Sequence, residues 1–113
     1  MMLSEKIWRQ AVLPLTASIE EAIESLNRTS LKIVLIANLD QSFMGTVSDG
    51  DIRRPMLRGK TLQSSVEQIA NIECFKVMDN FDLNTLPLIM RSHQIFQIPI
   101  VNANDELVVL HVW

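Results

Sequence analysis

A chain of 113 residues with a net charge of −3 is long enough for one domain and lacks the positive field that a nucleic-acid or anionic-membrane surface needs. Hydrophobic residues make up 48% of the sequence and charged residues 20%, which allows a sizeable core and excludes a disordered chain. A single cysteine excludes an internal disulfide framework. There is no signal peptide and no apolar run long enough to span a membrane, so we expect a soluble cytoplasmic protein.

The N-terminal elements are expected to be short. Residues 4–10 predict one helical turn, with Ile7 and Trp8 as its apolar anchors. Residues 12–15 predict a brief extended segment, because Pro14 disfavours helical backbone in the residue before it.

A longer helix is expected to begin with a capping box at Ser18. In such a box the serine hydroxyl caps the helix, and the acid three residues later, Glu21, reaches back to the cap residue. The acids of the first turn also suit the positive end of the helix dipole. Apolar residues then recur at the spacing of one helix face: Ile19, Ala22, Ile23 and Leu26.

A hairpin and a second helix complete the first half of the chain. Residues 31–37 form an almost unbroken apolar run, which is typical of a buried strand. Residues 38–42 are turn-forming, and residues 43–47 predict the returning strand. The helix that follows is expected to end near residues 58–59, where a basic last turn meets a glycine, and a polar connector over 61–72 carries one helical turn anchored by Val66 and Ile69.

The second half of the chain repeats the first without a gap at a displacement of 64 residues. Matched apolar or polar pairs include Ile19 with Leu83, Leu26 with Met90, Val34 with Ile98, and Asn38 with Asn102. Each half then reads strand, helix, strand, strand, and a further helix closes the first. One half alone is too small to bury enough surface, whereas two halves stacked through their sheets can do so. We therefore predict an α+β fold of two such repeats, residues 1–72 and residues 73–113, packed through their sheets into one compact module.

The same displacement carries the closing helix of the first repeat beyond Trp113. The second repeat is thus expected to lack its closing helix, and the chain is expected to be a piece of a longer protein.

The segment from Gly45 to Arg54 carries the chemistry that most suggests a binding site. An apolar strand leads through a Ser-Asp-Gly-Asp turn into a helix, and helix starts attract anions. A hydroxyl, a carboxylate and two guanidiniums (Ser48, Asp51, Arg53 and Arg54) would suit a ribose and a phosphate. The spacing of Ser48 and Asp51 also fits a capping box, so both interpretations stay open.

The two ungapped repeats resemble a pair of CBS domains, the regulatory unit called a Bateman module. Gly45 to Arg54 is similar to the family's Gly-x-x-Thr-x-x-Asp pattern, and Ile98 to Asn102 resembles its Pro-Val-Val-Asp strand. Trp8, the 33–36 strand, the Asp-Ile-Arg-Arg helix start and the 59–62 segment resemble the subgroup that lies N-terminal to sugar-phosphate nucleotidyltransferase domains.

The resemblance implies a regulatory module rather than an enzyme, binding AMP, ADP or ATP and controlling a C-terminal catalytic domain. Such a module is expected to require no cofactor. In that scheme Asp51 would hold the ribose, and Ser48 with Arg53 or Arg54 the phosphate. The residues facing the base would be Thr16, Leu31, Lys32 and Ile33. Such modules generally form homodimers. The alternative function is a structural dimerisation module without a working ligand site.

Two departures from the family pattern are visible. Pro55 falls inside the expected helix, and Val112 stands where the second repeat would need the counterpart of Ser48. We therefore expect one nucleotide per chain at most. Neither histidine has a catalytic partner at a useful spacing, and two acids on one turn make no convincing metal site, so no catalytic or metal-binding residue is predicted.

Overall fold

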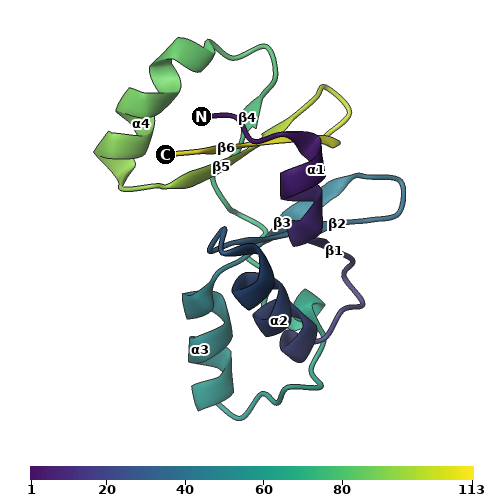
Figure 1. The fold of residues 1–113 in the computed structure, drawn as a ribbon. Helices are drawn as coiled ribbons and strands as arrows, with labels where there is room; N and C mark the ends of the chain where they lie inside the picture. The colour runs from purple at the N-terminus through teal and green to yellow at the C-terminus, as the bar shows by residue number, and fades with distance from the viewer.

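The computed structural model describes residues 1–113 as two three-stranded sheets, each with helices beside it (Figure 1). The first sheet has the order β1-β2-β3, with β1 at Val12–Leu13, β2 at Val34–Ala37 and β3 at Phe43–Val47. The second has the order β4-β5-β6, with β4 at Val77–Met78, β5 at Gln97–Val101 and β6 at Leu107–Val112. The helices are α1 (Glu5–Trp8), α2 (Ile19–Thr29), α3 (Asp49–Leu57) and α4 (Leu86–His93), with 3₁₀ turns at Arg9–Ala11, Val66–Gln68 and Leu83–Thr85. The predicted α+β class is confirmed.

The strand pairing confirms the internal repeat. In each half the first strand runs parallel to the second, and the second and third form an antiparallel hairpin. Val34 pairs with Val47, and 64 residues later Ile98 pairs with His111. The register shifts once in each hairpin, after Ile36 and after its counterpart Ile100. The two halves therefore share the irregularities of their sheets as well as the order of their elements.

The core between the two sheets is built from both halves. Seven buried residues form it: Trp8, Ile33, Leu35, Phe43, Val101, Leu107 and Leu110. This confirms the prediction that the repeats pack through their sheets. The predicted pair of anchors in α1 was only half right, because Trp8 is 1% exposed while Ile7 is 46% exposed. Consecutive helical residues point about 100° apart, so a single turn can bury only one of the two against the sheets.

The helices begin and end as local signals predicted, with small adjustments. Ser18 caps α2 by accepting a hydrogen bond from the Glu21 N–H at 3.1 Å, but the Glu21 carboxylate accepts no hydrogen bond from Ser18, so only half of the predicted capping box forms. Pro55 lies in the last turn of α3, which ends two residues later, so the missing N–H interrupts little helix. In the second half, Pro87 lies in the first turn of α4, where helices tolerate proline. A 3₁₀ turn replaces the first turn of the corresponding helix there.

The N-terminal segment crosses to the sheet of the other half, which the sequence did not predict. Leu3 N–H donates to the Leu110 carbonyl at 3.1 Å, and the Met1 amine donates to the Val112 carbonyl at 2.5 Å. Both chain ends therefore lie beside each other in the upper part of Figure 1. The Met1 amine also lies 3.1 Å from His111 Nε2. Burial, together with this positive charge, lowers the pKa of His111.

The molecule measures 41 × 31 × 24 Å along its principal axes. None of its helices combines the length and the apolar character needed to cross a membrane.

Candidate functional site

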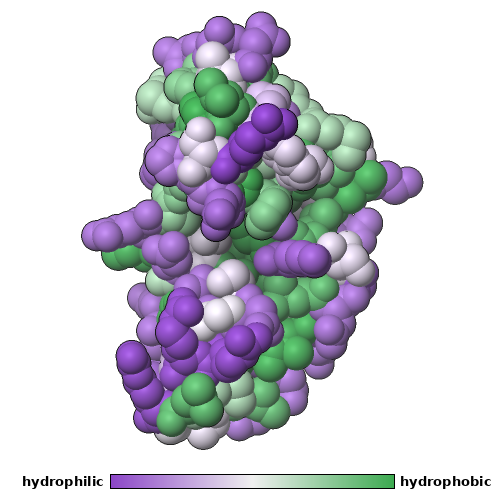
Figure 2. All heavy atoms as spheres, turned by 90° about the vertical axis from the view of Figure 1, so that its left-hand side faces the viewer, coloured by the Kyte–Doolittle hydropathy of each residue, from purple (hydrophilic) through white to green (hydrophobic).

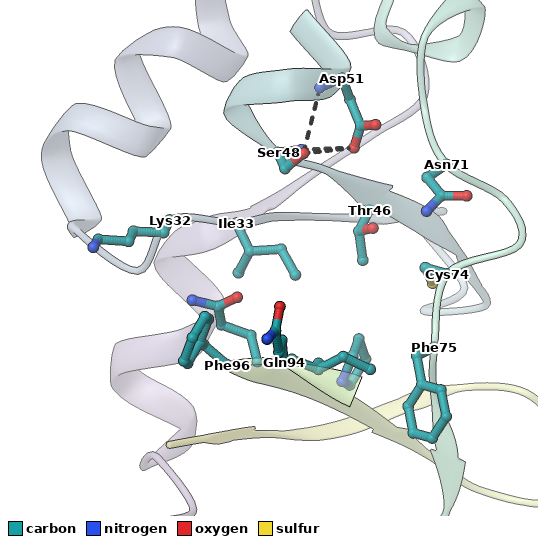
Figure 3. Close-up of a pocket in the computed structure, with 13 residues that line it drawn as sticks. Lys32, Ile33, Thr46, Ser48, Asp51, Asn71, Cys74, Phe75, Gln94 and Phe96 are labelled. Atoms are coloured by element: carbon teal, nitrogen blue, oxygen red, sulfur yellow. Dashed lines mark hydrogen bonds between the residues drawn. The ribbon is translucent and has the colours of Figure 1, made fainter. Parts of the chain in front are cut away.

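A pocket of about 440 Å³ opens between the two halves of the chain (Figure 3). The first half contributes Lys32, Ile33, Thr46, Ser48 and Asp51; the connector contributes Asn71; and the second half contributes Cys74, Phe75, Gln94, Ile95, Phe96, Gln97 and Pro99. Ser48 and Asp51 lie on one side of the pocket and Gln94 and Phe96 on the opposite side. The pocket thus brings together three segments that are far apart in sequence.

The start of α3 forms a complete capping box, which confirms the structural interpretation of Ser48 and Asp51. The Asp51 N–H donates to Ser48 Oγ at 3.3 Å, while the Ser48 N–H and hydroxyl both donate to Asp51 Oδ2 at 2.9 Å. The other carboxylate oxygen, Oδ1, accepts only from Arg54 at 3.2 Å. Capping therefore uses one oxygen of Asp51 and leaves the second with acceptor capacity.

Arg53 and Arg54 lie on the outer surface of α3 and do not line the pocket. Arg53 forms an ion pair with Asp49, one turn earlier on the helix, and Arg54 pairs with Asp51. Their side chains are 68% and 65% exposed. Both arginines are thus engaged with acids of their own helix, and the structure does not bring them together with Ser48 around one cavity.

Lys32 and Ile33 line the pocket because the backbone turns sharply between α2 and β2. Lys32 has a left-handed backbone, with φ of +65°, and so does Ser30, with φ of +57°. The strand predicted over residues 31–37 therefore starts only at Val34. Ile33 is buried, whereas Lys32 is exposed.

Two other predicted residues lie outside this pocket. Leu31 lines a second pocket instead, and Thr16, an exposed residue in the loop before α2, lines neither.

The connector reaches the pocket through a close approach to β3. The Thr46 N–H donates to the Asn71 carbonyl at 3.2 Å, and the Asn71 N–H donates to the Thr46 carbonyl at 2.8 Å. A Cβ on Gly45 would lie 2.6 Å from the Asn71 carbonyl oxygen, so only glycine permits this pairing. Glycine inside a strand marks such an approach, and it was the signal that could have placed the connector in the site.

Cys74 follows this pairing and lines the pocket at half-burial. Burial raises the pKa of its thiol, and a hydrogen bond with Thr46 opposes that shift less strongly. The neutral thiol therefore predominates, and Cys74 acts as a small hydrophobic residue in the pocket wall.

The second-half residues of the pocket are the repeat counterparts of the strand start around Lys32. Gln94 has a left-handed backbone, with φ of +55°, like its counterpart Ser30. Phe96, the counterpart of Lys32, is 58% exposed. Sequence reasoning missed residues 94–97 because it sought ligand contacts in the first half only, although the 64-residue displacement could have pointed to them.

A second pocket of about 360 Å³ is the counterpart of the first, because the 64-residue repeat relates the residues that line the two. Its lining residues are Ser30, Leu31, Lys32, Phe96, Gln97, Val112 and Trp113. All but Trp113 have a repeat counterpart in the lining of the first pocket. Val112 takes the place of Ser48 in its lining, so the Ser48 hydroxyl has no counterpart at that position.

The chain matches no protein-family model. Among curated proteins, it is 28% identical over 93 residues to the arabinose 5-phosphate isomerase GutQ of Escherichia coli strain K12, with 82% of this chain and 29% of that protein covered. The chain spans about a third of the length of the curated relatives it matches.

Solved structures share the fold, among them a CBS domain protein. The CBS domain protein PAE2072 from Pyrobaculum aerophilum, complexed with AMP, is 28% identical, with 89% of this chain and 78% of that chain covered and a TM-score of 0.74. A putative acetoin utilization protein, AcuB, from Vibrio cholerae is 20% identical, with 89% and 75% covered and a TM-score of 0.82.

Proposed function

We propose that this chain, which has the fold of a CBS domain pair, binds an adenine nucleotide and thereby regulates an attached enzyme domain. One observation carries the proposal: a pocket of about 440 Å³ between the halves combines a hydroxyl, a carboxylate and an ammonium with exposed aromatic side chains. That volume falls within the range of small-molecule sites. The AMP in the related PAE2072 structure supports the choice of ligand.

The polar groups of the pocket suit the sugar and the phosphate of a nucleotide. Asp51 Oδ1 has acceptor capacity for the ribose hydroxyls, and the Lys32 ammonium, which was expected to face the base, suits the phosphate. The Ser48 hydroxyl lines the pocket but donates its one hydrogen to Asp51 Oδ2. The flat side chains of Phe75 and Phe96, with Ile33, suit the base. Of the residues predicted to bind the ligand, the proposed site keeps Lys32, Ile33, Ser48 and Asp51. It leaves out four that do not line the pocket: Thr16, Leu31, Arg53 and Arg54.

The proposed domain division is residues 1–72 and residues 73–113. Under this division the first domain supplies the polar groups for the sugar and phosphate, and the second supplies the wall formed by residues 94–97. The ligand then bridges the two domains, which is how its binding would reach an attached enzyme.

The attached enzyme is proposed to act on a sugar phosphate. The sequence features resemble modules that precede sugar-phosphate nucleotidyltransferases, while the curated relative GutQ is a sugar-phosphate isomerase. Assays of the full-length protein for both reactions, each with and without AMP, distinguish the two enzyme classes.

Calorimetric titration with AMP, ADP and ATP tests the binding proposal. We expect saturable binding with one nucleotide per chain, because Val112 takes the place of Ser48 in the second pocket. A stoichiometry of two would contradict the proposed difference between the pockets. Absence of binding with all three nucleotides would instead support the alternative, a structural dimerisation module.

The module is further proposed to form a two-fold symmetric homodimer. Leu57 in α3 and Leu88 in α4 are 81% and 67% exposed, and Figure 2 shows hydrophobic surface on the side of the molecule where these helices lie. Apolar surface of this kind often marks an interface. Sedimentation at about tens of micromolar protein should show a dimer, since weak dimers form in that range. A monomer at that concentration would argue against it.

A further inference from the structure

One positive charge serves both pockets. Lys32 lines the first pocket and also the second, and no other lysine or arginine lines either of them. Phe96 and Gln97 are shared in the same way, so these three side chains form a common wall. Asp51 is the only acidic residue in either lining.

The ammonium of Lys32 has no partner in the structure, unlike the guanidinium groups of the two arginines near the site. It has no ion pair and no hydrogen bond, whereas Arg53 and Arg54 are paired with Asp49 and Asp51. Figure 3 shows the Lys32 side chain extended away from Asp51. A lysine side chain has a flexible four-carbon stem, so rotation about its bonds can bring this ammonium toward either pocket.

Arg54 already balances the Asp51 carboxylate, which leaves one uncompensated positive charge for a ligand. A phosphate monoester carries a charge of about −1.5 to −2 at neutral pH. The single ammonium of Lys32 suits one such group. Each further phosphate of a di- or triphosphate would bring negative charge into a partly enclosed pocket that holds no second cation to meet it.

We propose that Lys32 determines the class of ligand: the module accepts one phosphate monoester, so it selects a nucleoside monophosphate over the di- and triphosphates. The inference rests on the proposed nucleotide-binding function and makes it specific. Because one ammonium cannot occupy two pockets at once, a phosphate held in the first pocket also deprives the second of its only cation. The sharing of Lys32 thus gives a second, electrostatic reason for one nucleotide per chain.

Titration of the chain with adenosine, AMP, ADP and ATP, in the wild type and in Lys32→Met, tests this inference. In the wild type we expect AMP to bind about tenfold more tightly than ATP, with ADP between them. Lys32→Met should weaken AMP about tenfold through loss of one charge-assisted hydrogen bond, and leave adenosine unchanged. Lys32→Arg should retain most of the preference for AMP.

The matched control is Lys6→Met, which removes the same charge from α1, outside both pockets, and should leave all four affinities unchanged. Thermal melting confirms that each variant is folded, and Lys32→Gln replaces Lys32→Met if the latter is not. ATP binding as tightly as AMP, or an unchanged ratio of AMP to adenosine affinity in the Lys32 variant, would overturn the inference. Failure of the wild type to bind any of the four ligands would instead reject the nucleotide-binding function itself.

Discussion

Replacing Gly45 with alanine should destabilise the protein by about 3 kcal/mol, from overpacking against backbone and from backbone strain together. The added Cβ would lie 2.6 Å from the Asn71 carbonyl oxygen and 3.1 Å from its carbonyl carbon. Backbone atoms cannot rotate away as a side chain can. The φ of +149° at Gly45 adds strain, since L-residues rarely adopt it. For a domain of this size, the melting temperature should fall by about 10 °C or more.

The same substitution should open the pocket on its connector side. The alanine methyl group pushes Asn71 away from Thr46 and breaks the two backbone hydrogen bonds that join them. Cys74, three residues later, then loses burial, so the pKa of its thiol falls toward the ordinary value. Because the thiolate is the reactive form, Cys74 should react faster with iodoacetamide than in the wild type.

Gly59→Ala provides the matched control. Gly59 also has a positive φ, of +104°, but no atom lies within 4 Å of the position of a Cβ. This variant should lose only about 1 kcal/mol through backbone strain and should leave the reactivity of Cys74 unchanged. If Gly45→Ala proved no more destabilising than Gly59→Ala, the close approach of the connector would not be what requires glycine.

Asp51→Asn should weaken AMP binding about ten- to hundred-fold, which corresponds to about 1–3 kcal/mol, while the free energy of unfolding changes far less. An asparagine oxygen can take the place of Oδ2 and accept both hydrogen bonds from Ser48. Its NH₂ group then replaces Oδ1, where it faces Arg54 and the ribose hydroxyls as a donor among donors. The helix start should lose only about 0.5–1 kcal/mol of stability through weaker capping and dipole interactions.

Asp49→Asn separates a ligand contact from a general charge effect. Asp49 lies on the same helix turn, is 72% exposed, and pairs with Arg53 outside the pocket. Its substitution removes the same charge from the same helix start, so it should lower stability slightly and leave AMP affinity within about twofold, as expected for an exposed pair. Equal losses of affinity in the two variants, measured by calorimetry, would assign Asp51 a capping role alone.

The sequence by itself determined the architecture of the repeat. The 64-residue displacement, read from apolar positions, matches the pairing of Val34 with Val47 and of Ile98 with His111. Hairpin register follows directly from which side chains alternate toward the core, so a repeat of that pattern repeats the register. Caps and turns were likewise predictable, because the interactions that form them span only three or four residues, as between Ser48 and Asp51.

Only the tertiary structure decided which predicted residues share a cavity. Arg53 and Arg54 lie two and three residues after Asp51 in sequence, yet neither lines the pocket, because each helical residue rotates about 100° from the last and acids of the same helix pair with both. Lys32 enters the pocket through a left-handed backbone conformation that no sequence pattern announced. Asn71 reaches it only because the connector packs onto Gly45. Local signals specify turns and elements, whereas a pocket between two halves depends on how those halves pack, and that is set by the shared core around Trp8 and Leu35.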